Sequence, residues 1–188
     1  MAQYSNQPKL LSELIKDFEP ISVKQDLFVH AVTTDSRQVQ SHTLFLALPG
    51  HKDDGRAYIL SAIEQGACAI LYDNNICLSE KVCALLQQED NTVIAIGVEN
   101  LQQHVAKIAA RFYGFPAKRL LVSAVTGTNG KTSTAFVLAQ TLQRLGQPAG
   151  LIGTLGQGKV GESLQTTGLT TPGAVDLQRI FSNLSTLG

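Results

Sequence analysis

The residues with the clearest chemical meaning lie in the segment 126–133, which reads TGTNGKTS. Glycines at 127 and 130 let the backbone curl so that successive N–H groups point inward, toward the place that the free N–H groups of a following helix also face. Lys131 adds a positive charge, and the Thr132 hydroxyl is an oxygen ligand of the kind that Mg²⁺ prefers. The segment therefore predicts a phosphate-binding turn, shortened because only Thr128 and Asn129 stand where the common pattern has four residues.

The sequence on either side of this turn predicts the elements that would position it. The segment 120–125 is almost wholly apolar, as expected of a parallel strand that is covered on both faces. A helix is expected from Lys131 to Gly146, where glycine suits the position after a helix end. The residues alone also allow a glycine-rich turn with a surface lysine. The apolar side of the helix is expected to consist of Phe136, Val137, Ala139, Gln140, Leu142 and Leu145.

Short strands and helices alternate through the first part of the chain, which predicts an α/β sheet with helices on both faces. The segment 115–119, FPAKR, interrupts this alternation and indicates a domain boundary, with one domain at 1–116 and a second at 117–188. The second domain is expected to be an incomplete P-loop α/β domain, because few residues follow the boundary. The expected strands are 30–33, 43–50, 68–73, 92–98 and 149–156, and the expected helices are 10–18, 57–67, 78–88, 100–114 and one from about Ala174.

Four polar residues, Thr33 to Ser36, follow the first of these strands. Their hydroxyls and carboxylate could bind a ligand at the end of the strand. Such residues also hydrogen-bond their own backbone in turns, and the residues alone favour that interpretation.

The composition excludes several classes of protein. Lys plus Arg and Asp plus Glu are 15 each, so no basic excess indicates nucleic-acid binding. No apolar run is long enough for a transmembrane helix, and the start lacks the apolar core of a signal peptide. Three cysteines, at 68, 77 and 83, lack metal-site spacing and are expected to be reduced thiols. The expectation is a cytoplasmic monomer that binds neither membrane nor nucleic acid.

Several separate blocks together resemble the Mur ligases. They are TTDSRQV, LFLALPGHKDDGR, TGTNGKTST preceded by RFYGFP, and GLIGTLGQG followed by TTPGAVDLQ, and they span about residues 30–180. The resemblance is greatest to the branch that adds the third amino acid of the peptidoglycan peptide. It implies a ligase that uses ATP and Mg²⁺ to join meso-diaminopimelate or L-lysine to UDP-MurNAc-L-Ala-D-Glu through an acyl phosphate.

The resemblance also implies roles for individual residues. Thr132 matches the Mg²⁺-binding hydroxyl, Lys131 acts on the transferred phosphate, and Leu169 stands where the family often has Asn. Members of the family are longer, and the acidic Mg²⁺ ligand and the amino-acid pocket lie in the part that this chain does not match. The ATP contacts are expected at Gly127, Thr128, Asn129, Gly130, Lys131, Thr132 and Ser133, the uridine contacts at Thr34, Ser36, His51, Lys52 and Asp53, and the muramoyl-peptide contacts at Thr170 and Thr171.

Two other functions fit the sequence. One is another Mur-type ligase that acts on a different muramoyl peptide. The other is a non-catalytic module that binds a nucleotide and responds to no UDP-sugar. In either ligase reading, the 188-residue chain is expected to be inactive by itself.

Overall fold

A computed structural model gives the fold as two units, Met1–Phe112 and Tyr113–Gly188, each of which is described by itself. The structure describes residues 7–16, 26–50, 54–75, 77–88, 92–162, 164–166 and 171–186.

The first unit is built on a parallel sheet whose strands are hydrogen-bonded in the order β3-β4-β5-β6. Every residue of β4 is buried, as expected of a strand covered on both faces. Because side chains alternate along a strand, Phe45 and Ala47 face one side of the sheet while Leu44 and Leu46 face the other. The bounds of the strands are β3 Ala31–Thr33, β4 Thr43–Ala47, β5 Ala67–Asp73 and β6 Ile94–Val98.

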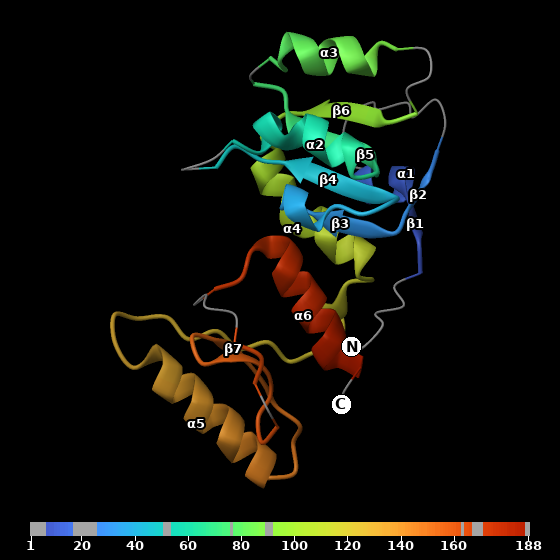
Figure 1. The fold of residues 1–188 in the computed structure, drawn as a ribbon. Helices are drawn as coiled ribbons and strands as arrows, with labels where there is room; N and C mark the ends of the chain where they lie inside the picture. Colours follow the sequence, from blue (N-terminus) through green and yellow to red (C-terminus); the bar gives the residue numbers. More distant parts are fainter. Residues whose placement is uncertain are drawn as a thin grey trace. The chain divides into compact units, whose positions relative to one another are not determined.

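Helices cover the two faces of this sheet, and Figure 1 shows α2 and α4 on opposite sides of it. On the α2 side, Phe45 and Ile70 of the sheet pack with Ile59 of α2 and Val82 of α3. On the other side α4 contacts β5 and also α1, and the buried Arg111 of α4 donates from Nη1 to the Leu14 carbonyl at 2.9 Å. The helices are α1 Leu11–Ile15, α2 Ile59–Glu64, α3 Glu80–Leu86 and α4 Leu101–Phe112, with 3₁₀ turns η1 Ser36–Gln38 and η2 Gly55–Tyr58 and a small antiparallel pair, β1 Lys9–Leu10 with β2 Phe28–Val29.

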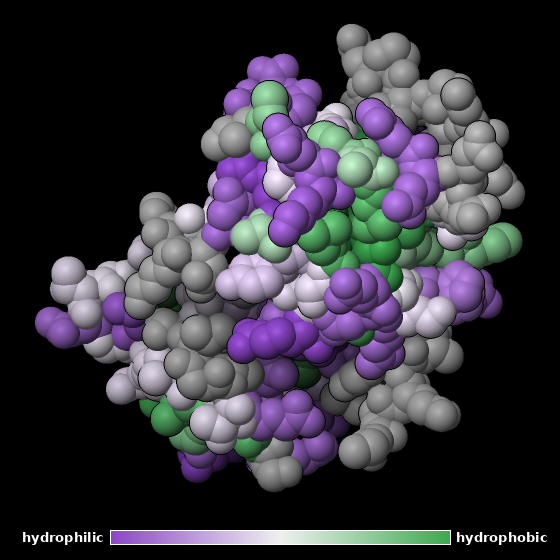
Figure 2. Space-filling view, turned by 45° about the horizontal axis from the view of Figure 1, so that its top comes forward, coloured by the Kyte–Doolittle hydropathy of each residue, from purple (hydrophilic) through white to green (hydrophobic). Residues whose placement is uncertain are grey.

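The α/β sheet with helices on both faces is therefore confirmed for the first unit. The expected helix 57–67 differs at its start, because residues up to Tyr58 form the 3₁₀ turn η2. The helix near Ser79 is capped by that residue, whose hydroxyl accepts from the Val82 N–H at 3.4 Å. In Figure 2 hydrophobic side chains on the visible face of this unit gather in one patch between hydrophilic ones.

The second unit has a small core where α5 packs on a hairpin. Ala139 of α5 is buried with Ala149, Leu151 and Val160. The helix ends as predicted, because Gly146 takes φ +77° and the Gln147 N–H reaches back to the Leu142 carbonyl at 2.9 Å. The elements are η3 Pro116–Arg119, α5 Lys131–Arg144, β7 Gly150–Gly153, β8 Gly156–Lys159 and α6 Ala174–Thr186, and α6 begins where the sequence predicted.

The prediction of one strand at 149–156 was wrong. The strand β7 ends at Gly153, and the chain turns back as β8, which pairs antiparallel with β7. Thr154 and Leu155 form the turn, and Gly156, which follows it as the first residue of β8, has φ +127°. A glycine-rich stretch that was expected to be a connection thus supplies a second strand.

The prediction of a buried strand at 120–125 was also wrong. This segment forms no strand, and Leu121 is 97% exposed. A strand exists only through hydrogen bonds to a neighbouring strand, and the part of the chain that the structure describes offers this segment none. The expected apolar side of α5 is likewise largely uncovered, with Val137 and Leu145 at 59% and 72% exposed.

Among the described residues, none of the helices combines the length and apolarity that crossing a bilayer requires. Cys68, Cys77 and Cys83 are free thiols. Burial raises the pKa of Cys68, which favours the uncharged thiol.

Candidate functional site

The predicted phosphate-binding turn is a sharp bend that ends in a helix. Gly127 has φ +148° and Gly130 has φ +75°, values that strain any residue with a Cβ. The helix α5 follows at once, and its first turn is closed by the Thr134 N–H donating to the Gly130 carbonyl at 2.9 Å. The two glycines are therefore required by the backbone, as the sequence indicated.

Lys131 folds back over this turn. Its Nζ donates to the Gly127 carbonyl at 2.7 Å and lies 3.4 Å from the Thr128 carbonyl. The side chain is half-buried although the turn itself is exposed. The positive charge is thus held at the turn by neutral oxygens, which phosphate oxygens could replace with stronger, charge-assisted hydrogen bonds.

The remaining groups of the turn also suit a polyphosphate. Thr132 is half-buried and Ser133 exposed, at the positive end of the α5 dipole. The first turn of α5 contains no acidic residue that would repel an anion. These donors fit the phosphates of a nucleotide, and the Thr132 hydroxyl fits one position in the oxygen shell of Mg²⁺.

The polar residues after β3 divide into two pairs. The Thr33 hydroxyl accepts from the Asp35 N–H at 3.0 Å, and Asp35 caps η1 by accepting from the Arg37 N–H at 3.0 Å. These two residues form the turn that the residues alone favoured. Thr34 is exposed and Ser36 half-buried, and within the described residues their side chains make no such bonds. Both residues follow the carboxyl end of β3, at the edge where open parallel sheets bind ligands.

Two protein-family models match the chain. The Mur ligase family, catalytic domain, matches residues 28–113, and the Mur ligase middle domain matches residues 125–187. The chain belongs to the Mur ligase family. Its α/β fold, with a parallel sheet in the first unit, agrees with that membership. The resemblance of the sequence blocks to the Mur ligases is confirmed.

The chain is similar to curated relatives in one branch of the Mur ligases. One is the UDP-N-acetylmuramoyl-L-alanyl-D-glutamate--2,6-diaminopimelate ligase of Coxiella burnetii, 41% identical over 180 residues that cover 96% of this chain and 35% of the relative. The Pseudomonas putida protein of the same name is 44% identical over 160 residues, covering 85% of this chain and 30% of the relative. The chain thus spans about a third of the length of these relatives.

Solved structures support the fold. A structure of a protein with the same ligase name matches 97% of this chain and 34% of its own, with a TM-score of 0.67 and 19% identity. MurF from Acinetobacter baumannii matches 94% of this chain and 33% of its own, with a TM-score of 0.53 and 19% identity. At these identities the likeness concerns the Mur ligase fold alone.

The other predicted Mur ligase contacts are placed only in part. His51, Lys52, Asp53, Leu169 and Thr170 lie outside the described residues. The segment that holds the first three is closed at its base by a bridge between Pro49 and Asp54 and by the Gly55 N–H donating to the Leu48 carbonyl at 2.8 Å. Thr171 is exposed just before α6. The uridine candidates belong to the first unit, and the phosphate-binding turn and Thr171 belong to the second.

Two exposed side chains near Ser36 were not singled out from the sequence. Arg37 follows Ser36 directly, and Tyr58 lies within the expected helix 57–67 but ends η2 with 43% of its surface exposed. The two turns are neighbours, because η1 packs against α2, which continues from Tyr58. The repeated pattern Asp-x-Arg, at 35–37 and 54–56, was the signal that could have drawn attention to this place.

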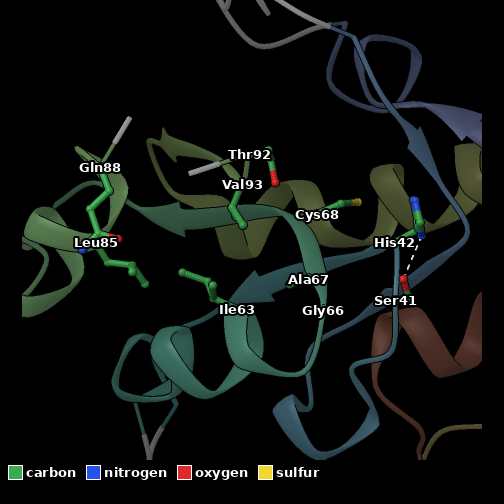
Figure 3. Close-up of a pocket in the computed structure, with 10 residues that line it drawn as sticks. All are labelled: Ser41, His42, Ile63, Gly66, Ala67, Cys68, Leu85, Gln88, Thr92 and Val93. Carbon is green, nitrogen blue, oxygen red and sulfur yellow. Dashed lines mark hydrogen bonds between the residues drawn. The ribbon is translucent and has the colours of Figure 1, made fainter. Parts of the chain in front are cut away.

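A hollow of about 450 Å³ lies at the other end of the sheet, before the strands begin. Figure 3 shows Ile63, Leu85 and Val93 pointing toward one another at one end of it, and the Ser41 hydroxyl 2.9 Å from the His42 Nδ1 at the other. The predicted site residues do not line it. It is therefore separate from the edge of the sheet that carries Thr34 and Ser36.

Proposed function

We propose that this chain carries the uridine-nucleotide unit and the ATP-binding turn of a ligase that joins 2,6-diaminopimelate to UDP-N-acetylmuramoyl-L-alanyl-D-glutamate. The identities of 41% and 44% to relatives of that name support this substrate over a lysine-adding alternative. The reaction belongs to peptidoglycan synthesis in the cytoplasm. The contact of the Lys131 ammonium with the Gly127 carbonyl, 2.7 Å long, is the observation that carries the proposal.

The turn supplies what the first chemical step needs. A substrate carboxylate that attacks the γ-phosphorus of ATP must approach a strongly negative group, and it displaces ADP to form an acyl phosphate. When ATP binds, the Lys131 ammonium would leave the Gly127 carbonyl and donate to phosphate oxygens. The N–H groups at the start of α5 would donate to the same phosphates. Thr132 would supply a hydroxyl ligand to Mg²⁺, which would offset further negative charge on the phosphates. An amine of diaminopimelate then attacks the acyl carbon, and inorganic phosphate leaves.

The first unit would hold the substrate by its nucleotide end. Thr34 and Ser36 present hydroxyls for the uridine nucleotide, and His51, Lys52 and Asp53 would meet it from the next strand end. Thr170 and Thr171 would hold the muramoyl-peptide end. Binding at an end far from the reacting carboxylate positions that carboxylate for attack.

Calorimetric titration of the chain with Mg·ATP and with UDP-MurNAc-L-Ala-D-Glu tests the proposal. Lys131→Ala should weaken ATP binding at least tenfold, because a charged hydrogen bond to phosphate is lost. It should leave binding of the UDP-peptide unchanged, since that ligand is assigned to the other unit. Lys81→Gln, which removes an exposed charge from α3, is the matched control and should alter neither. Equal loss of both ligands in Lys131→Ala would contradict the two-unit assignment.

Choice of the UDP-peptide separates the alternatives. The proposal requires that UDP-MurNAc-L-Ala-D-Glu raises the melting temperature of the chain more than the UDP-MurNAc-tripeptide does. The opposite order would favour another Mur-type ligase. A response to ATP with none to either UDP-peptide would favour a nucleotide-binding module without ligase function. Assay of the 188-residue chain should give no tripeptide product.

A further inference from the structure

Two neighbouring strand ends carry the same arrangement of an aspartate and an arginine. Asp35 Oδ1 accepts from both the backbone N–H and the Nε of Arg37, at 3.0 and 2.9 Å, while Oδ2 accepts from Nη2. Asp54 makes the same set of bonds with Arg56, at 3.0 and 2.8 Å. Each aspartate thereby starts a 3₁₀ turn and fixes the direction of a guanidinium group.

Burial separates the two pairs. The Arg56 side chain is 10% exposed, and its position beside β4 explains why the fold needs a partner for it. The Arg37 side chain is 87% exposed, whereas that of Asp35 is only 29% exposed. An ion pair so open to water contributes little to folding. Within the described residues, the packing explains the geometry at Arg56 but gives the ordered guanidinium of Arg37 no structural role.

The exposed guanidinium has capacity for a ligand. Of the five N–H donors of an arginine, Asp35 uses one on Nε and one on Nη2, which leaves three. The Asp35 side chain is much less exposed than that of Arg37, so the positive group is the one that solvent mainly meets. The hydrogen bond to Asp35 raises the pKa of Arg37, which keeps the guanidinium charged.

The surroundings match a nucleoside diphosphate. Thr34 and Ser36 offer hydroxyls beside the cation, and Tyr58 offers an exposed ring. These groups lie at the carboxyl ends of β3 and β4, the edge at which parallel sheets bind nucleotides. A planar guanidinium binds two phosphate oxygens at once, which a hydroxyl cannot do.

We propose that Arg37 binds the diphosphate of the uridine nucleotide, and that Asp35 is a positioning residue that aims the guanidinium before the substrate arrives. The inference rests on the proposed function of the first unit. It adds to the hydroxyls of Thr34 and Ser36 a charged contact that recognises the diphosphate separately from the uridine. Preorganisation by Asp35 lowers the cost of ordering the arginine on binding.

Titration of the 188-residue chain with uridine, UMP and UDP tests this assignment. Arg37→Gln should lower UDP affinity about tenfold and leave uridine affinity within twofold, because only the diphosphate contact is lost. Arg37→Lys should bind UDP with an affinity between those of the wild type and Arg37→Gln. Lysine keeps the charge but lacks the planar group that binds two phosphate oxygens at once. Lys81→Gln removes an exposed charge elsewhere in the same unit and should leave UDP affinity unchanged. The urea midpoint of Arg37→Gln should equal that of the wild type.

The role of Asp35 is tested by combination. Asp35→Asn should weaken UDP binding less than Arg37→Gln does. The double variant should match Arg37→Gln alone, because Asp35 acts only through the arginine. Additive losses would show that Asp35 has an independent role and would contradict its assignment as a positioning residue.

The outcomes separate this inference from the proposed function. If the wild-type chain binds UDP and Arg37→Gln binds it equally well, the arginine assignment is wrong and the uridine site stands. Equal loss of UDP and uridine binding in Arg37→Gln would also overturn the assignment. If the wild-type chain binds neither UDP nor the UDP-peptide, the proposed function of the first unit fails, and this inference fails with it.

Discussion

The strand β4 and the segment 120–125 are both largely apolar in sequence, but one is buried and the other is exposed. TLFLA in β4 is buried at every residue, whereas LLVSAV in the second unit is exposed at every residue after the first. The strand β4 lies between β3 and β5 and is hydrogen-bonded to both. The comparison teaches that an apolar run specifies an extended backbone and a need for neighbours, and that strand and burial appear only where neighbours are supplied.

Hydrogen exchange should give the largest difference between these two segments. Amides of β4 are expected to exchange only through opening of the sheet, at least a thousandfold more slowly than amides of 121–125, which have no ladder partners among the described residues. Mass spectrometry of peptides that cover each segment measures the ratio. Slow exchange in 121–125 would show that this segment finds a partner in solution, such as a second copy of the chain.

Truncation of one large side chain in each segment should sharpen the comparison. Phe45 is fully buried, so Phe45→Ala should lower the free energy of unfolding of the first unit by about 3–5 kcal/mol. Leu121→Ala, at a side chain that is 97% exposed, should change stability by no more than about 0.5 kcal/mol. Urea unfolding followed by circular dichroism measures both. Similar losses in the two variants would contradict the exposed environment of Leu121.

A smaller and pH-dependent effect is expected at the ion pair between Asp54 and Arg56 in the first unit. The hydrogen bond from Arg56 is the largest cause that holds the pKa of Asp54 below its usual range. Stabilisation is therefore complete above the unfolded pKa of about 3.9 and is lost as the pH falls through the lower folded value. Because the Asp54 side chain is 45% exposed, Asp54→Asn should cost at most about 1 kcal/mol at pH 7.

Comparison of wild type and Asp54→Asn at two pH values checks the sign of this effect. The difference in urea midpoint should be present at pH 7 and should shrink in acid, as the wild-type carboxylate becomes protonated. A difference that stays constant, or that grows in acid, would show that the substitution acts through shape and not through charge.

The smallest effect on folding is expected from charge added to the exposed apolar surface of the second unit. Leu121→Lys combined with Leu145→Lys should leave the unfolding free energy unchanged within about 0.5 kcal/mol, because both side chains are mostly exposed. The same variant should self-associate less than the wild type at high concentration, since exposed apolar segments tend to pair between chains. Light scattering and urea unfolding measure the two properties. A marked loss of stability would mean that these leucines are covered in solution.

The sequence was most informative where local and long-range requirements agree. The starts of β4 and α6 and the glycine after α5 were predicted correctly, because a short pattern and its packing demand the same structure. The bend at 127–131 was predictable for the same reason, since its two glycines are needed by the backbone.

The failures came where the structure depends on residues distant in sequence. Burial of 120–125 requires neighbouring strands, which the sequence of the segment does not report. The hairpin of β7 and β8 turns at Thr154 and Leu155, and a run with several glycines nearby does not show from sequence alone where the chain reverses. At Arg37 and Arg56 the same three-residue pattern gives the same bonds, and only the packing around each one separates the exposed cation from the buried one.

The bridge between Pro49 and Asp54 has a consequence for how the sequence between these residues can vary. The bridge, together with the bond from Gly55 to Leu48, ties the two ends of the intervening segment directly to the end of β4. The entropic cost of joining fixed ends grows only with the logarithm of the length between them. Insertions, deletions and substitutions between these anchors are therefore expected to cost the sheet little free energy.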